Sequence, residues 1–87
     1  MIMETVNPLL YNLPTRTKLL KDSSGSLFIV IDRKSRVVMK DGHRVLNVVK
    51  HIKEVNQKAN ISLLTSAPVC SKTNEFLSKN KIPTLAL

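Results

Sequence analysis

Residues 43–57, HRVLNVVKHIKEVNQ, decide the fold of this chain, because their apolar side chains repeat with the period of an α-helix. The repeated positions lie on one face of that helix and comprise Val45, Val48, Val49, Ile52 and Val55, with Leu46 widening the stripe. Valine is a mediocre helix former, so this helix depends on packing against a sheet. Asp41 precedes the helix, and its carboxylate suits the N-terminus. The pattern predicts an amphipathic helix lying on a sheet.

Apolar, β-branched runs on both sides of this helix predict the strands. Residues 26–32 lack polar alternation, which is typical of a central strand buried on both faces, and residues 60–65 form a second such run. Shorter strands are expected at residues 17–21, 36–40 and 82–87. Residues 22–25 are predicted to turn, with Gly25 free to adopt a positive φ. A short helix is expected at residues 71–79, with Phe76 and Leu77 facing inward.

These elements give the order β-β-β-α-β-α-β and the class α/β, with α+β as an alternative. Short strand-helix-strand links favour parallel pairing and right-handed crossovers. We therefore expect a small mixed sheet with two helices packed on it, as two layers or three. Residues 16–87 form one domain, and residues 1–15 are interpreted as an extended N-terminal arm. Its apolar side chains, Leu9, Leu10, Tyr11 and Leu13, would dock on the domain or on a partner.

Charge is the strongest functional signal in the composition. The chain contains 14 Lys and Arg residues but only six Asp and Glu residues, which gives a formal charge of +8. A chain this basic attracts polyanions. Nucleic acid is the commonest such partner, followed by an acidic protein or an anionic membrane surface. Aromatic residues are only 3% of the chain, which argues against stacking of single-stranded bases. Structured RNA or duplex DNA, read through shape and phosphates, suits the composition better.

The basic residues gather in the middle of the sequence, where Asp41 and Glu54 are the only nearby acids after Asp32. A hairpin tip and the start of the predicted helix would bring them to one edge of the domain, facing a phosphate backbone. A solvated helix face and turn is the alternative interpretation. The candidate nucleic-acid-binding residues are Arg33, Lys34, Arg36, Lys40, Arg44, Lys50 and Lys53.

Signals for catalysis are few. Asp32 follows a predicted central strand, a frequent place for a catalytic carboxylate, but Arg33 and Lys34 come next, so we interpret it as part of a charged turn. His43 and His51 are eight residues apart, whereas chelation on a helix favours a spacing of three or four. The two glycines are too few for a phosphate-binding glycine loop. We expect no catalytic residue, metal site or cofactor.

Cys70 is the only cysteine, which excludes an internal disulfide and a multi-cysteine zinc site. The residues from Ile61 to Cys70, followed by Phe76-Leu77 and Ile82-Pro83, form a strand-loop-helix-strand unit that resembles the active-site region of glutaredoxins. That family carries a Cys-Pro-x-Cys motif, which matches residues 67–70 here. Cys70 takes the resolving position and Ala67 the nucleophile position, so the resemblance implies no disulfide exchange activity. Cys70 precedes a helix, where its thiol is either reactive or a small buried apolar group.

The sequence thus predicts a non-enzymatic, basic binding domain that contacts RNA, DNA or a ribonucleoprotein. The alternative is a small protein-interaction or assembly subunit that docks an acidic partner. A degenerate thioredoxin- or glutaredoxin-like protein is third. Residues 1–4 lack the features of a signal peptide, and the longest apolar run, residues 27–31, is too short to span a membrane. We therefore expect a cytoplasmic protein.

Overall fold

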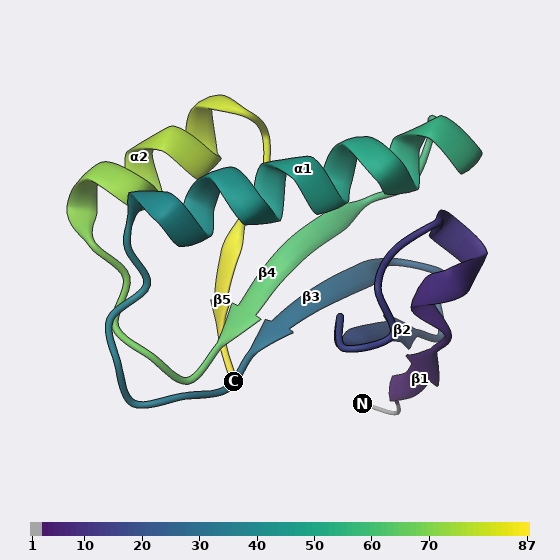
Figure 1. The fold of residues 1–87 in the computed structure, drawn as a ribbon, viewed down its shortest axis with the longest axis horizontal. Helices are drawn as coiled ribbons and strands as arrows, with labels where there is room; N and C mark the ends of the chain where they lie inside the picture. The colour runs from purple at the N-terminus through teal and green to yellow at the C-terminus, as the bar shows by residue number, and fades with distance from the viewer. Residues whose placement is uncertain (1–2) are drawn as a thin grey trace.

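The computed structural model describes residues 3–87, which fold into a five-stranded sheet with two α-helices on one of its faces (Figure 1). The chain runs through β1 (Met3–Val6), the 3-10 helix η1 (Pro8–Tyr11), β2 (Leu19–Asp22), β3 (Leu27–Ile31), α1 (Met39–Val55), β4 (Ile61–Thr65), α2 (Ser71–Lys79) and β5 (Thr84–Ala86). The described part of the molecule is therefore a two-layer α/β domain.

The sheet is mixed, and its strands lie in sequence order, β1-β2-β3-β4-β5. β1, β2 and β3 pair antiparallel, whereas β3, β4 and β5 pair parallel. α1 connects β3 to β4 and α2 connects β4 to β5, so both crossovers step in the same direction and leave both helices on one face. The predicted class, element order and mixed sheet are confirmed.

The core lies between the sheet and α1. The helix buries Val45, Val48, Val49 and Ile52, of which Ile52 is completely inaccessible. They pack against the face of the sheet that carries Leu27, Ile29, Ile61 and Leu63. Val55 is an exception to the predicted stripe, because it is the last residue of α1 and is 55% exposed. α2 contributes Leu77, which is fully buried, and Phe76, which is partly buried.

The first turn of α1 lies where a strand was expected. Residues 36–40 do not form a strand: Val37 makes a single parallel bridge to Val69, and α1 begins at Met39. Asp41 accepts the backbone N–H of Val38 at 2.9 Å, which satisfies a donor that would otherwise be free at the helix N-terminus. Asp41 therefore stabilises a helix start four residues earlier than the apolar pattern indicates.

The N-terminal segment belongs to the domain. Residues 1–15 were expected as an extended arm, yet β1 pairs with β2 along four residues, and η1 packs beside α1. Pro8 and Leu13 are buried, while Leu9 and Leu10 point to solvent. Met1 and Ile2 lie outside the described residues. Three strands therefore precede α1 as predicted, but one of them is β1 from this segment, and residues 36–40 supply none.

Candidate nucleic-acid interface

A groove lies over the carboxyl half of β3, between the loop that precedes β2 and the face of α1. Its volume is about 430 Å³. Ile29, Ile31 and Val45 contribute apolar lining, because these side chains face the layer between sheet and helix. Four cationic residues also line it, from three separate parts of the chain: Arg16, Lys18, Arg33 and Arg44. Only two carboxylates accompany them, those of Asp32 and Asp41.

Arg33 fixes the loop between β3 and α1. Its guanidinium donates to the backbone carbonyls of Ser35 and Arg36, both at 3.1 Å, and pairs with the carboxylate of Asp41. The Asp41 side chain is only 10% exposed, whereas that of Arg33 is 34% exposed. One arginine thus holds a compact turn against the start of α1. Lys34 and Arg36, which belong to this turn, remain exposed.

These contacts favour the ionised form of Asp41. The Arg33 guanidinium is the largest cause that lowers the pKa of Asp41, and the backbone N–H of Val38 and the charge of Arg44 lower it further. Partial burial opposes them. The net direction is downward, so the carboxylate stays ionised to lower pH than an ordinary aspartate and neutralises part of the Arg33 charge.

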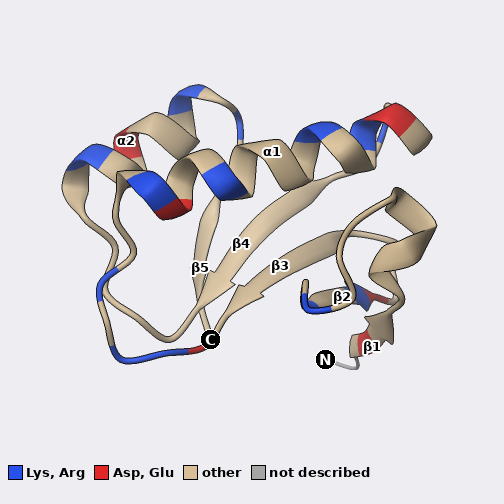
Figure 2. Ribbon diagram, viewed as in Figure 1, with Lys and Arg blue, Asp and Glu red and all other residues tan. Residues whose placement is uncertain are grey.

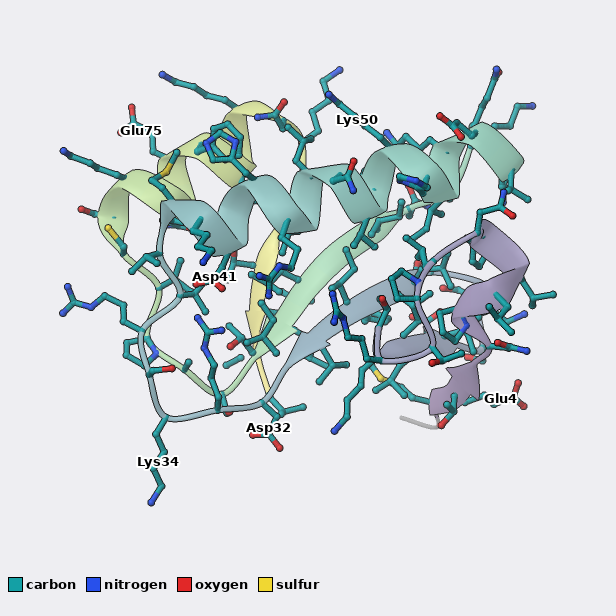
Figure 3. The ribbon with its side chains drawn as sticks, viewed as in Figure 1. Glu4, Asp32, Lys34, Asp41, Lys50 and Glu75 are labelled. Atoms are coloured by element: carbon teal, nitrogen blue, oxygen red, sulfur yellow. The ribbon has the colours of Figure 1, made fainter. Side chains whose placement is uncertain are left out.

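The structure divides the seven candidate residues into two sets. Arg33, Lys34, Arg36, Lys40 and Arg44 lie on the β3–α1 loop and the first turns of α1, at one end of the molecule (Figure 2). Lys50 and Lys53 lie farther along α1. Lys50 extends away from the sheet, and Lys34 extends outward from the tip of the loop (Figure 3). Lys53 lines a second, smaller cavity beside Asn60 and Lys81. The seven basic residues from the middle of the sequence therefore do not form one continuous surface.

Arg16 and Lys18 were missed by the sequence analysis. Both are exposed, and both reach the groove from the loop before β2. They are more than a dozen residues from Arg33 in sequence. Only the antiparallel pairing of β2 with β3 brings them beside it. Lys18 lies within the strand predicted at residues 17–21, but periodicity did not predict which strand would pair with it.

Asp32 is exposed in this cationic groove, directly after β3 (Figure 3). Ser66, directly after the parallel strand β4, donates its hydroxyl to Asp32 Oδ1 at 2.6 Å. Two side chains at the carboxyl ends of adjacent parallel strands therefore meet. Asp32 was expected to be part of a charged turn, and the structure places its carboxylate in the lining of the cationic groove.

The three aromatic rings offer no platform for bases. Phe28 is 6% exposed, and Tyr11 and Phe76 are partly buried against the core. Phe76 also meets the ring of His43, with centroids 4.7 Å apart. Stacking on an open aromatic face, the usual means of holding single strands, is thus not built into residues 3–87.

The remaining candidates are separate from the groove. Cys70 lies at the N-terminus of α2 and is partly exposed. The ring Nδ1 of His51 is 2.9 Å from the carbonyl of Asn47 on the same helix. Within residues 3–87, His, Cys, Asp and Glu side chains form no group of three or more that could hold a metal ion. Across the same residues, neither helix has the length and apolar character needed to cross a bilayer.

The solved structures that share this fold include two of EndoMS. The apo form superposes with a TM-score of 0.65 and 18% identity, over 80% of this chain and 33% of that one. The EndoMS–dsDNA2 complex superposes with a TM-score of 0.72 and 15% identity, over 98% of this chain and 36% of that one. The chain thus spans about a third of the length of EndoMS. No protein family and no curated protein matches the sequence.

The comparison corrects one expectation. The chain was predicted to be non-enzymatic, but it shares its fold with a protein whose name denotes an endonuclease and whose structure includes double-stranded DNA. The prediction of a non-enzymatic domain is therefore wrong, because the same fold occurs in an enzyme. At 15% to 18% identity the likeness establishes the fold and assigns no activity to this chain. It is compatible with the predicted binding of nucleic acid.

Proposed function

We propose that this chain binds duplex DNA, with a phosphate backbone following the groove over β3. The observation that carries the proposal is the convergence of Arg16, Lys18 and Arg44 on that groove from separate elements. Such residues bind phosphates without regard to sequence. The exposed cations of the adjacent turn, Lys34 and Arg36, extend the same surface. The fold shared with the EndoMS–dsDNA2 complex supports a DNA duplex as the polyanion.

Two features favour a duplex over other polyanions. The aromatic rings are buried or partly buried, so single strands lack a stacking surface. Arg33 is already fixed by Asp41 and by the turn, so the loop is ordered before any ligand arrives. An ordered cationic edge suits a ligand whose phosphates are themselves regularly spaced, because little conformational entropy is lost on binding.

The test is fluorescence anisotropy with a labelled 20-base-pair duplex of arbitrary sequence. The double variant Arg16→Gln/Lys18→Gln removes two groove contacts. Each exposed contact is worth about 1 kcal/mol, so affinity should fall roughly 30-fold at low salt. The control is Lys50→Gln/Lys79→Gln, which lowers the net charge equally from exposed helix positions outside the groove lining. We expect a fall of less than threefold for the control.

Competition separates DNA from an acidic protein partner. Unlabelled duplex should displace the labelled one more effectively than polyglutamate of the same total charge. If polyglutamate competes equally well, or both double variants lose affinity equally, the groove is not a DNA site. An acidic protein partner then becomes the better hypothesis.

Cleavage of the bound DNA is a second candidate function, and Asp32 is the observation that favours it. The Asp32 carboxylate accepts the Ser66 hydroxyl but has no cationic partner among the described residues. A negative charge repels phosphate, so its place in a phosphate-binding groove indicates another use. It would act as a general base or would hold a divalent cation against the phosphate. Nicking of supercoiled plasmid in the presence of Mg²⁺ tests this. The nicking should disappear in Asp32→Asn while duplex binding persists, and plasmid that stays intact with the wild type excludes the candidate.

A further inference from the structure

A second cavity lies at the amino ends of β4 and β5, beside the C-terminal half of α1. Its volume is about 240 Å³, and it shares no lining residue with the groove. Exposed polar residues line it, namely Lys53, Lys81 and Asn60, and no Asp or Glu of residues 3–87 does. Its base consists of buried core residues, namely Val49, Ile61 and Ile82. This lysine cavity is therefore apolar at its base and cationic at its rim.

The two lysines come from different elements. Lys53 lies in the last turn of α1, and Lys81 lies in the loop between α2 and β5. Within residues 3–87 neither lysine forms an ion pair with a carboxylate. Lys53 also complements the dipole at this end of α1, but that interaction gives no reason for Lys81. Two like charges beside one cavity repel each other, and an anion between them would offset this repulsion.

Lys81 adopts a backbone conformation that lysine disfavours. Its φ is +60°, in the left-handed region that favours glycine. The N–H of Lys81 donates to the carbonyl of Ser78 at 3.0 Å, and the N–H of Ile82 donates to that of Leu77 at 2.9 Å. This Schellman motif ends α2 and usually carries glycine at its left-handed position. Lysine at this position costs stability, which indicates that its side chain has a use at the cavity.

We propose that the lysine cavity binds the dianion of a phosphate monoester. The ammonium groups of Lys53 and Lys81 neutralise the phosphate, and the amide of Asn60 donates a hydrogen bond to it. The apolar base accepts the carbon group of the ester. The cavity is smaller than the roughly 300–1,000 Å³ of ordinary ligand pockets, so the ligand is small. Binding here does not depend on duplex binding, because the two sites share no residue.

Phenyl phosphate is the probe, because it joins a phosphate dianion to an apolar ring. Titration of the full chain at constant ionic strength, followed by NMR, should give saturable shifts at the backbone amides of the cavity lining. Lys53→Gln/Lys81→Gln should weaken binding about tenfold or more, because two charge-assisted contacts are lost. Lys50→Gln/Lys79→Gln removes the same charge outside the cavity and should keep the wild-type affinity.

Two duplexes of one sequence identify the source of the ester, because a phosphate monoester occurs both in small metabolites and at the 5′ end of a nucleic-acid strand. One duplex carries 5′-phosphates and the other 5′-hydroxyls. Tighter binding of the phosphorylated duplex, abolished in Lys53→Gln/Lys81→Gln, assigns the cavity to strand ends. Equal binding of the two duplexes, with phenyl phosphate still bound, assigns it to free esters.

Lys81→Gly separates binding from stability. Glycine relieves the left-handed backbone, so this variant should unfold at a higher urea concentration than the wild type, yet it should bind phenyl phosphate more weakly. An unchanged or lower urea midpoint would remove the reason for assigning the lysine to a ligand. The proposal is overturned if Lys81→Gly binds as tightly as the wild type. It is also overturned if phenyl phosphate gives no saturable shifts, or if both double variants lose affinity equally.

Discussion

Replacing Asp41 with Asn should remove the contact that holds the β3–α1 turn to the start of α1. The Asp41 carboxylate pairs with Arg33 and accepts the N–H of Val38, and its side chain is 10% exposed. A charge-assisted hydrogen bond contributes about 1.5–3 kcal/mol when shielded, but Arg33 is a third exposed, so solvent screening reduces this. A favourable charge in the first turn adds about 0.3–1 kcal/mol. We expect Asp41→Asn to cost about 2 kcal/mol.

The stabilisation by Asp41 should also depend on pH, in a direction set by its lowered pKa. Folding lowers the pKa of Asp41, so the unfolded chain binds more protons than the folded chain between the two pKa values. The stabilisation is therefore complete above the unfolded pKa of about 3.9 and is lost as the pH falls through the lower, folded pKa. The free-energy difference between wild type and Asp41→Asn should be constant from pH 5 to 7 and should shrink below pH 4.

Urea denaturation followed by circular dichroism measures both effects. The control is Glu75→Gln, which removes an exposed carboxylate paired with Lys79 at 3.6 Å and should change stability by less than about 0.5 kcal/mol. The reasoning is refuted if Asp41→Asn unfolds at the same urea concentration as wild type at pH 7. It is also refuted if the difference between the two proteins persists unchanged at pH 3.

Three further predictions concern the core, the β2–β3 turn and the groove. Ile52→Ala should destabilise the domain by about 2–5 kcal/mol in urea, because this side chain is fully buried, whereas Val55→Ala should cost little. Gly25→Ala should cost about 1–2 kcal/mol by thermal unfolding, since Gly25 has φ +92° and an added Cβ meets no atom within 4 Å, so only the backbone conformation opposes it; an unchanged melting temperature would contradict this. Asp32→Asn should tighten duplex binding about fivefold in anisotropy measurements without divalent cations, because a like charge leaves the groove, and weaker binding would count against the groove as a phosphate site.

Local patterns were sufficient for much of the fold. Residues 71–79 form α2 as predicted, and the apolar runs at residues 27–31 and 61–65 form the two adjacent parallel strands at the centre of the sheet. These elements carry strong signals of their own. The turn at residues 22–25 also follows from composition, since the Asp22 side chain accepts the N–H of Ser24 and Gly25 adopts a positive φ.

Long-range contacts decided the rest. Val37 and Val38 favour a strand by their side chains, but the bridge to Val69 and the contacts of Asp41 end the extended segment and start α1. Residues 3–6 have little periodicity, and only the pairing with β2 makes them a strand. The residues that line the groove were also only partly predictable from the sequence. Arg33 and Arg44 were found as part of a basic run, whereas Arg16 reaches them only through the order of the strands.

The salt dependence of duplex binding tests the central claim most directly. If Arg16, Lys18 and Arg44 each neutralise one phosphate, the slope of log affinity against log salt concentration should be about −2.7 for duplex DNA. Arg33 is not counted because it is paired with Asp41, and contacts from the adjacent turn would make the slope steeper. Arg16→Gln/Lys18→Gln should flatten the wild-type slope by about 1.8, and Lys50→Gln/Lys79→Gln should leave it unchanged. A wild-type slope near zero, or equal flattening in both double variants, would contradict the groove as the DNA-binding site.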